Sequence, residues 1–175
     1  IVPCFSGKDF RMKKILFILK ERHYSPSKNS YGLINSAKHV ADFLDSSDYE
    51  CKVVSVVDGN SIDKEVFDFK PDIVIIEAIW CPVLKLKELI EMERYKKIKW
   101  IVRVHSDMAF LSCETQAIRM LNGYIDLHKK NLILTVNTKK LVEPLSDALR
   151  YKFTYLPNVI TIRHCMEDDF LEEKG

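Results

Sequence analysis

The chain has 175 residues, 47% hydrophobic and 30% charged, a composition typical of one folded domain and not of a disordered chain. Its 27 Lys and Arg residues nearly balance 25 Asp and Glu residues, giving a net charge of +2, so nucleic acid is not an expected partner. No apolar run reaches the roughly 18 residues that a membrane-spanning helix needs, so no transmembrane segment is expected.

The cysteines indicate reduced thiols and a cytoplasmic location. There are five, they lie far apart, and none forms a C-x-x-C pair, which argues against a disulfide framework or a zinc site. H-E-x-x-H and D-x-D motifs are also absent from the sequence. We therefore expect neither a metal nor a cofactor.

Short apolar runs rich in Ile and Val alternate with amphipathic stretches, which predicts strands alternating with helices. In chain order the first half contains a strand at Lys14–Leu19, a helix at Leu33–Leu44, a strand at Cys51–Val57, a short helix or turn and helix at Ser61–Phe69, and a strand at Asp72–Ile76. The second half contains a helix at Leu84–Ile90, a strand at Trp100–Val104, a helix at Phe110–Tyr124, a strand at Leu132–Val136, a helix at Leu141–Leu149 and a strand at Phe153–Leu156. Pro144 predicts either a kink in the last helix or a start near Glu143.

This alternation predicts a single α/β domain, a doubly wound, Rossmann-like parallel sheet in three layers, α/β/α. The preferred strand order is 3-2-1-4-5-6, and the flavodoxin-like order is the second choice. The domain is expected to span residues 12–159. Residues 1–11 are interpreted as an appended or mobile segment, and residues 160–175 as a hinge or tail toward a missing second domain.

Open parallel sheets bind ligands beyond the carboxyl ends of their strands, which directs attention to the loops there. The first of these loops lacks G-x-G-x-x-G, so dinucleotide binding is disfavoured. It ends in Ser30 and Gly32, which could hold an anion or sugar hydroxyls at a helix N-terminus. The alternative is a solvated loop in which Ser30 caps the helix.

Further candidates follow the later strands. His105 directly follows a strand and is placed to act as an acid, a base or a hydrogen-bond donor, with Asp107 orienting it or capping the next helix. Glu77 is either a carboxylate in the site or a solvated strand end. Trp80 either stacks on a ring or closes the end of the core. Asn137, after the fifth strand, completes the set.

Five segments together resemble a known family. They are Lys13–Ile18, the stretch from Ser30-Tyr-Gly32 to Leu44, Lys70-Pro-Asp72-Ile-Val-Ile-Ile-Glu77, Val104-His105-Ser-Asp107, and Leu132–Thr138 with Tyr155-Leu-Pro157-Asn158-Val159. In this order they resemble the N-terminal, acceptor-side domain of a group 1 glycosyltransferase with the two-Rossmann-domain (GT-B) fold. The sequence departs from the family in having one glycine in its first loop and Val159 after Asn158.

The resemblance implies a function and a set of roles. Gly32 would lie near the diphosphate of a nucleotide-sugar donor, His105 would bond a hydroxyl of the transferred sugar, and Asn158 would face the cleft at the hinge. A second Rossmann-like domain would carry most donor contacts, so this chain alone is expected to be inactive. The acceptor is not indicated.

Two alternatives stay open. One is a stand-alone flavodoxin-like or receiver-like binding module, although a receiver needs a phospho-acceptor Asp after its third strand, where Glu77 stands. The other is a different small-molecule α/β enzyme, of which the hydrolase version is weakened by the absence of G-x-S-x-G. The lysine clusters are spread over different elements and are interpreted as solvated surface; they are Lys96, Lys97 and Lys99, then Lys129 and Lys130, then Lys139 and Lys140.

Overall fold

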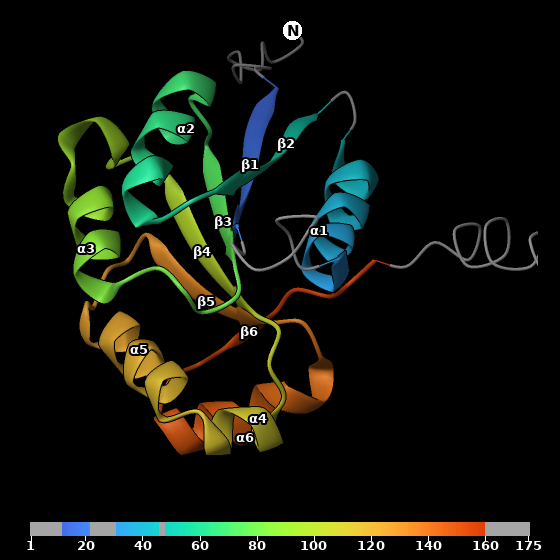
Figure 1. The fold of residues 1–175 in the computed structure, drawn as a ribbon, viewed down its shortest axis with the longest axis vertical. Coiled ribbons are helices and arrows are strands. Elements are labelled where there is room, and N and C mark those ends of the chain that lie inside the picture. The colour runs from blue at the N-terminus through green and yellow to red at the C-terminus, as the bar shows by residue number, and fades with distance from the viewer. Residues whose placement is uncertain (1–11, 22–30, 46–47, 160–175) are drawn as a thin grey trace, which may run out of the picture.

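The computed structural model describes residues 12–21, 31–45 and 48–159, which form one six-stranded sheet with helices on both faces (Figure 1). All neighbouring strands pair in parallel. The strands are β1 (Lys13–Lys20), β2 (Tyr49–Val56), β3 (Ile73–Glu77), β4 (Lys99–Val104), β5 (Leu132–Val136) and β6 (Thr154–Tyr155). Each predicted strand is confirmed, with its ends shifted by at most two residues.

The strand order is β2-β1-β3-β4-β5-β6. The preferred order, 3-2-1-4-5-6, was therefore wrong, and the flavodoxin-like order is found, with β6 added beside β5. Burial explains the difference, because β2 carries Glu50, Lys52 and Ser55 and is mostly half-buried, as suits an edge strand. Strand β3 is apolar up to Glu77 at its end and almost fully buried, as suits a strand with neighbours on both sides.

The helices are α1 (Tyr31–Leu44), α2 (Ile62–Phe69), α3 (Val83–Glu91), α4 (Met108–Cys113), α5 (Thr115–Asp126) and α6 (Lys139–Leu149), with single 3-10 turns η1 (Gly59–Ser61) and η2 (Glu93–Tyr95). The single helix expected over residues 110–124 was wrong, because the chain leaves helical geometry at Glu114. Phe110 and Cys113 face solvent, so their spacing did not mark one buried stripe. Helix α6 begins at Lys139 and runs through Pro144, so of the two alternatives for this helix the start near Glu143 is wrong.

The three predicted layers are present. Helices α2, α3, α5 and α6 contribute to the larger hydrophobic cluster on one face of the sheet, whereas α1 packs with the smaller cluster on the other face (Figure 1). Alternate residues along each central strand supply the two clusters, as the two-residue period of a strand requires. None of the described helices has the length and hydropathy to cross a membrane.

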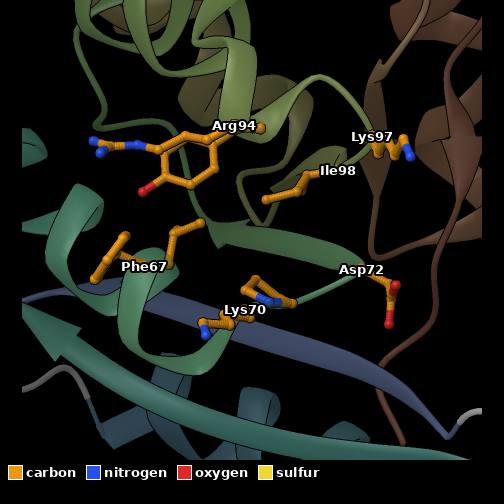
Figure 2. A pocket seen from close by; sticks show the side chains of 9 residues that line it. Phe67, Lys70, Asp72, Arg94, Lys97 and Ile98 are labelled. Atoms are coloured by element: carbon orange, nitrogen blue, oxygen red, sulfur yellow. The ribbon is translucent and has the colours of Figure 1, made fainter.

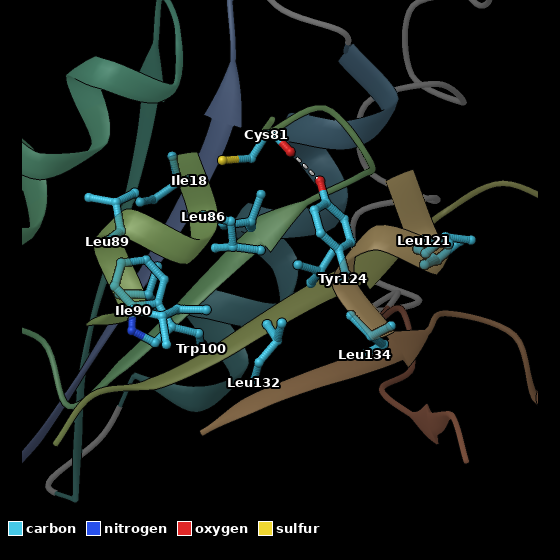
Figure 3. Close-up of a cluster of buried hydrophobic side chains, with 14 of the residues drawn as sticks. Ile18, Cys81, Leu86, Leu89, Ile90, Trp100, Leu121, Tyr124, Leu132 and Leu134 are labelled. Atoms are coloured by element: carbon cyan, nitrogen blue, oxygen red, sulfur yellow. Dashed lines mark hydrogen bonds between the residues drawn. The ribbon is translucent and has the colours of Figure 1, made fainter. Parts of the chain in front are cut away.

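The larger cluster fixes the loop that follows β3. Trp100 is fully buried in it and meets the ring of Tyr95 edge-on, at a centroid distance of 6.3 Å. Figure 3 shows Tyr124 of α5 reaching the main chain at Cys81, where its hydroxyl donates to the carbonyl oxygen. This buried bond ties the β3–α3 loop to α5 and so sets the course of the chain after β3.

Candidate site at the carboxyl ends of the central strands

Strands β3, β4 and β5 lie side by side, so the residues at their carboxyl ends are neighbours. The register pairs Glu77 at the end of β3 with Arg103 on β4. His105 and Asn137 follow the last residues of β4 and β5, which are themselves register partners. The topology thus brings three of the predicted site residues to one place on the sheet, together with Arg103.

These four side chains form a continuous hydrogen-bond network. The Arg103 guanidinium donates to both Glu77 carboxylate oxygens, at 3.1 and 3.4 Å, and both side chains are completely buried. His105 Nε2 bonds to Glu77 Oε2, and the Asn137 amide nitrogen lies 3.3 Å from His105 Nδ1. A neutral imidazole with its proton on Nε2 satisfies both contacts, because Nε2 then donates and Nδ1 accepts.

Arg103 also binds the chain that follows β6. Its Nε donates to the carbonyl of Leu156 at 3.3 Å, and its Nη2 donates to the carbonyl of Pro157 at 2.9 Å and to the Asn158 side-chain oxygen at 2.5 Å. The Ser36 hydroxyl of α1 donates to the same Asn158 oxygen at 2.7 Å. Asn158 therefore joins the network, and its amide oxygen is held from two sides.

The buried charges of Glu77 and Arg103 balance each other. An isolated buried carboxylate or guanidinium is strongly unfavourable, and a pair is tolerated when hydrogen bonds satisfy the remaining polar atoms. Glu77 and Arg103 meet this condition through His105 and the carbonyls after β6. The His105 side chain, 12% exposed, is the partly accessible member of the buried trio.

The turn after β3 is set by an unusual backbone conformation. Ala78 has φ of 70°, a left-handed value that is costly for a residue with a Cβ, and its N–H donates to the Arg103 carbonyl at 2.9 Å. The chain bends sharply there, and the Trp80 indole nitrogen donates back to the Glu77 carbonyl at 2.9 Å. Trp80 is half-buried against the larger cluster, which fits the interpretation that it closes the end of the core.

Other predicted residues do not join the network. The Asp107 carboxylate accepts the Phe110 N–H at 2.8 Å and so caps α4, which fits the capping alternative. Gly32 is exposed in the first turn of α1, and a Cβ built on it would meet nothing within 4 Å. Ser30 lies outside the described residues. Ser36, one turn further along α1, is the residue of this helix that reaches the site.

The sequence analysis missed Arg103 and Ser36. Arg103 stands inside the apolar run Trp100–Val104, and a charge within a buried strand is itself a signal that an opposite charge lies opposite. Ser36 carried no such signal, because a serine on a helix is most often solvated. In the described part of the chain, no three His, Cys, Asp or Glu side chains are grouped so that they could hold a metal ion.

Comparison with known proteins adds a fold-level likeness. No family model matches the sequence, and no curated protein matches it. A solved structure that matches is the chemotaxis response regulator CheY4 of Vibrio cholerae, with 14% identity and a TM-score of 0.46 over 79% of this chain and 100% of that one. At this identity and TM-score the likeness carries no argument about function.

Proposed function

We propose that this domain is a ligand-binding module of flavodoxin-like topology, and that it holds a hydroxyl-rich small molecule beside His105 at the carboxyl ends of β3, β4 and β5. The observation that carries the proposal is the His105–Glu77 contact at the edge of a charge-balanced network. Because the charges of Glu77 and Arg103 cancel, the site favours a neutral, polar ligand over a strongly charged one.

The topology supports this location. Strand β1 has β2 on one side and β3 on the other, so the chain changes direction across the sheet between β1 and β3. Ligands of open α/β sheets bind at such a switch point, beyond the carboxyl ends of the strands. Glu77, at the end of β3, borders this switch point, and His105 follows β4, one strand further on.

His105 can exchange one protein partner for a ligand. The contact between its Nδ1 and the Asn137 amide is 3.3 Å, at the long end of hydrogen-bond distances. A ligand hydroxyl could replace this weak donor and leave the Glu77 contact in place. Glu77 would then orient the imidazole, and His105 would accept from the ligand.

A second candidate is the acceptor-side half of a glycosyltransferase, in which the same site would contact the transferred sugar. One observation favours it: Glu77, His105 and Asn158 come from three of the segments that resemble the family, and they meet in one network. Only this second candidate involves a nucleotide-sugar donor, an acceptor and a second Rossmann-like domain.

The receiver version of the module has less support. A phosphorylated receiver needs a reachable carboxylate after β3, whereas the Glu77 side chain is fully buried and bonded to Arg103 and His105. We therefore propose a binding role that involves no phosphoryl transfer to this position.

The test is an NMR titration of the isotopically labelled chain with glucose, UDP-glucose, GDP-mannose and ADP-glucose. We expect saturable shifts of the His105 ring and the Asn137 side-chain amide, and their loss in His105→Phe. His128→Asn is the matched control, because His128 is exposed and follows α5, away from the site, and Asn tolerates its left-handed backbone. Binding of nucleotide sugars but not of glucose would favour the glycosyltransferase half. No shift at His105 with any of the four would overturn both candidates.

A further inference from the structure

A pocket of about 360 Å³ lies at the other end of the strands from the candidate site, where α2 ends and where β3 and β4 begin. Its buried lining includes Val66, Pro71 and Ile98. Phe67 stands beside these residues with 55% of its surface exposed. Figure 2 shows Phe67 and Ile98 on opposite sides of the pocket, with charged side chains around them. The pocket therefore offers an apolar surface that the described residues leave uncovered.

One wall of the pocket is linked by side-chain contacts. Arg94 donates to both Asp63 carboxylate oxygens, at 2.7 and 2.8 Å, and the Tyr95 hydroxyl donates to the same carboxylate at 2.7 Å. The guanidinium lies 4.9 Å from the centre of the Tyr95 ring and 5.7 Å from that of Phe67. Arg94 thus contacts both aromatic rings at this wall while its charge is paired with Asp63.

The rim of the pocket is positively charged. Lys70 and Lys97 line it, both are exposed, and neither makes an ion pair with another described residue. Asp72 also lines the pocket, but its carboxylate accepts the Lys14 N–H at 2.9 Å. Lys70 has a φ of 54°, where glycine would be favoured by about 1 kcal/mol. An apolar floor between two lysines suits an acidic segment that carries a large apolar side chain.

The chain contains such a segment. Residues 167–173 read EDDFLEE, five carboxylates around the pair Phe170-Leu171. These residues lie outside the described part of the structure. We propose that this segment docks in the pocket of the same molecule, with Phe170 against Phe67 and Ile98 and with its carboxylates beside Lys70 and Lys97.

The segment is long enough to reach. Val159 packs with the smaller cluster on the α1 face, close to the carboxyl ends of the strands. The 11 residues from Val159 to Phe170 extend to about 36 Å. The pocket is one strand length away, and the six residues of β4 rise about 20 Å. The length of chain that is left over allows the segment to pass from the α1 face of the sheet to the face that carries the pocket.

The test is carbodiimide cross-linking of the full chain, which joins a lysine amine to a nearby carboxylate, followed by peptide mass spectrometry. We expect links from Lys70 or Lys97 to residues 167–173, in the monomer and independent of protein concentration. Lys139 and Lys140 serve as internal controls and should give few such links, because they lie at the start of α6, at the carboxyl ends of the strands and away from the pocket. Links spread evenly over all lysines would overturn the proposal. So would links found only in dimers that mix labelled and unlabelled chains.

Matched variants separate the apolar anchor from the charges. Phe170→Ser keeps every carboxylate, and we expect it to lower the yield of the Lys97 links at least several-fold. Lys70→Gly removes one rim charge at a backbone position that glycine prefers, so it should leave the fold intact and weaken the links from Lys97. If Phe170→Ser leaves the yield unchanged, the segment is held by charge alone and the pocket is not its docking site.

Discussion

Arg103 is the residue on which the carboxyl-end site depends. It neutralises Glu77 inside the sheet and bonds three groups of the chain after β6. We expect Arg103→Leu to destabilise the protein by about 3–5 kcal/mol, because it leaves a buried carboxylate without a counterion. Urea unfolding measures this loss.

The double variant Arg103→Leu with Glu77→Leu is the control for the preceding prediction. Removing both charges should recover part of the lost stability, because no unpaired ion then remains. A loss below 1 kcal/mol in the single variant would contradict a dry, coupled pair.

The thiols differ in exposure, and their reactivity should follow. Cys81 is fully buried, and burial raises the pKa of its thiol to about 12. The pKa of Cys51 is raised to about 11, first by burial and then by Asp45 and Asp42. A raised pKa keeps a thiol protonated and unreactive at pH 8, whereas Cys113 is exposed. Among these three thiols of the described residues, we expect iodoacetamide at pH 8 to modify Cys113 first and Cys81 last, as peptide mass spectrometry would show. In urea Cys113 and Cys81 should react alike, and early modification of Cys81 in the native protein would contradict its burial.

At the scale of elements, α3 and α5 meet through a glycine. A Cβ on Gly123 of α5 would lie 2.6 Å from Val83 Cγ2 of α3, well inside van der Waals contact. We expect Gly123→Ala to destabilise the protein by about 1–3 kcal/mol through overpacking, measured by thermal or urea unfolding. Adding Val83→Ala should relieve the clash. A neutral Gly123→Ala would show that the helices separate at little cost.

Gly32→Ala is the matched control for Gly123→Ala, and here we expect no loss of stability. It lies in the first turn of α1 with open space where a Cβ would stand. Gly32→Ala should be neutral or stabilising by up to about 1 kcal/mol, because alanine favours the helix.

The strands were predictable because their apolar, β-branched runs are a local signal, and the order of the strands was not. Right-handed crossovers are compatible with both orders considered, so the choice depends on which strand is polar enough to lie at an edge. Glu50 and Lys52 in β2 carried that information. The helix break at Glu114 had no local marker, since Phe110 and Cys113 kept helical spacing while facing solvent.

The candidate site was predictable in part. Glu77, His105 and Asn137 follow from the rule that ligands bind at the carboxyl ends of parallel strands, whereas Asn158 was indicated by the family resemblance alone, and the structure brings the four together. The contacts of Arg103 needed the register between β3 and β4, which no single strand encodes. The shared position of Lys70 and Lys97 at one pocket was not predictable either, because the two residues come together only after the sheet is assembled.

At the scale of the whole molecule, we predict that the purified chain shows no appreciable sugar transfer. Transfer from a nucleotide sugar requires groups that stabilise the charge of a departing diphosphate. Arg103 is buried, and its guanidinium is already bonded to Glu77 and to the chain after β6. His105 can offer a ligand only the ring nitrogen that now meets Asn137, because the other is bonded to Glu77. This network therefore leaves no cationic group free to stabilise a diphosphate. The measurement is release of UDP, GDP or ADP from the corresponding sugar nucleotides, with His105→Phe as the control. Release above the buffer blank that disappears in His105→Phe would contradict the prediction, because it would place complete transfer chemistry at this one site.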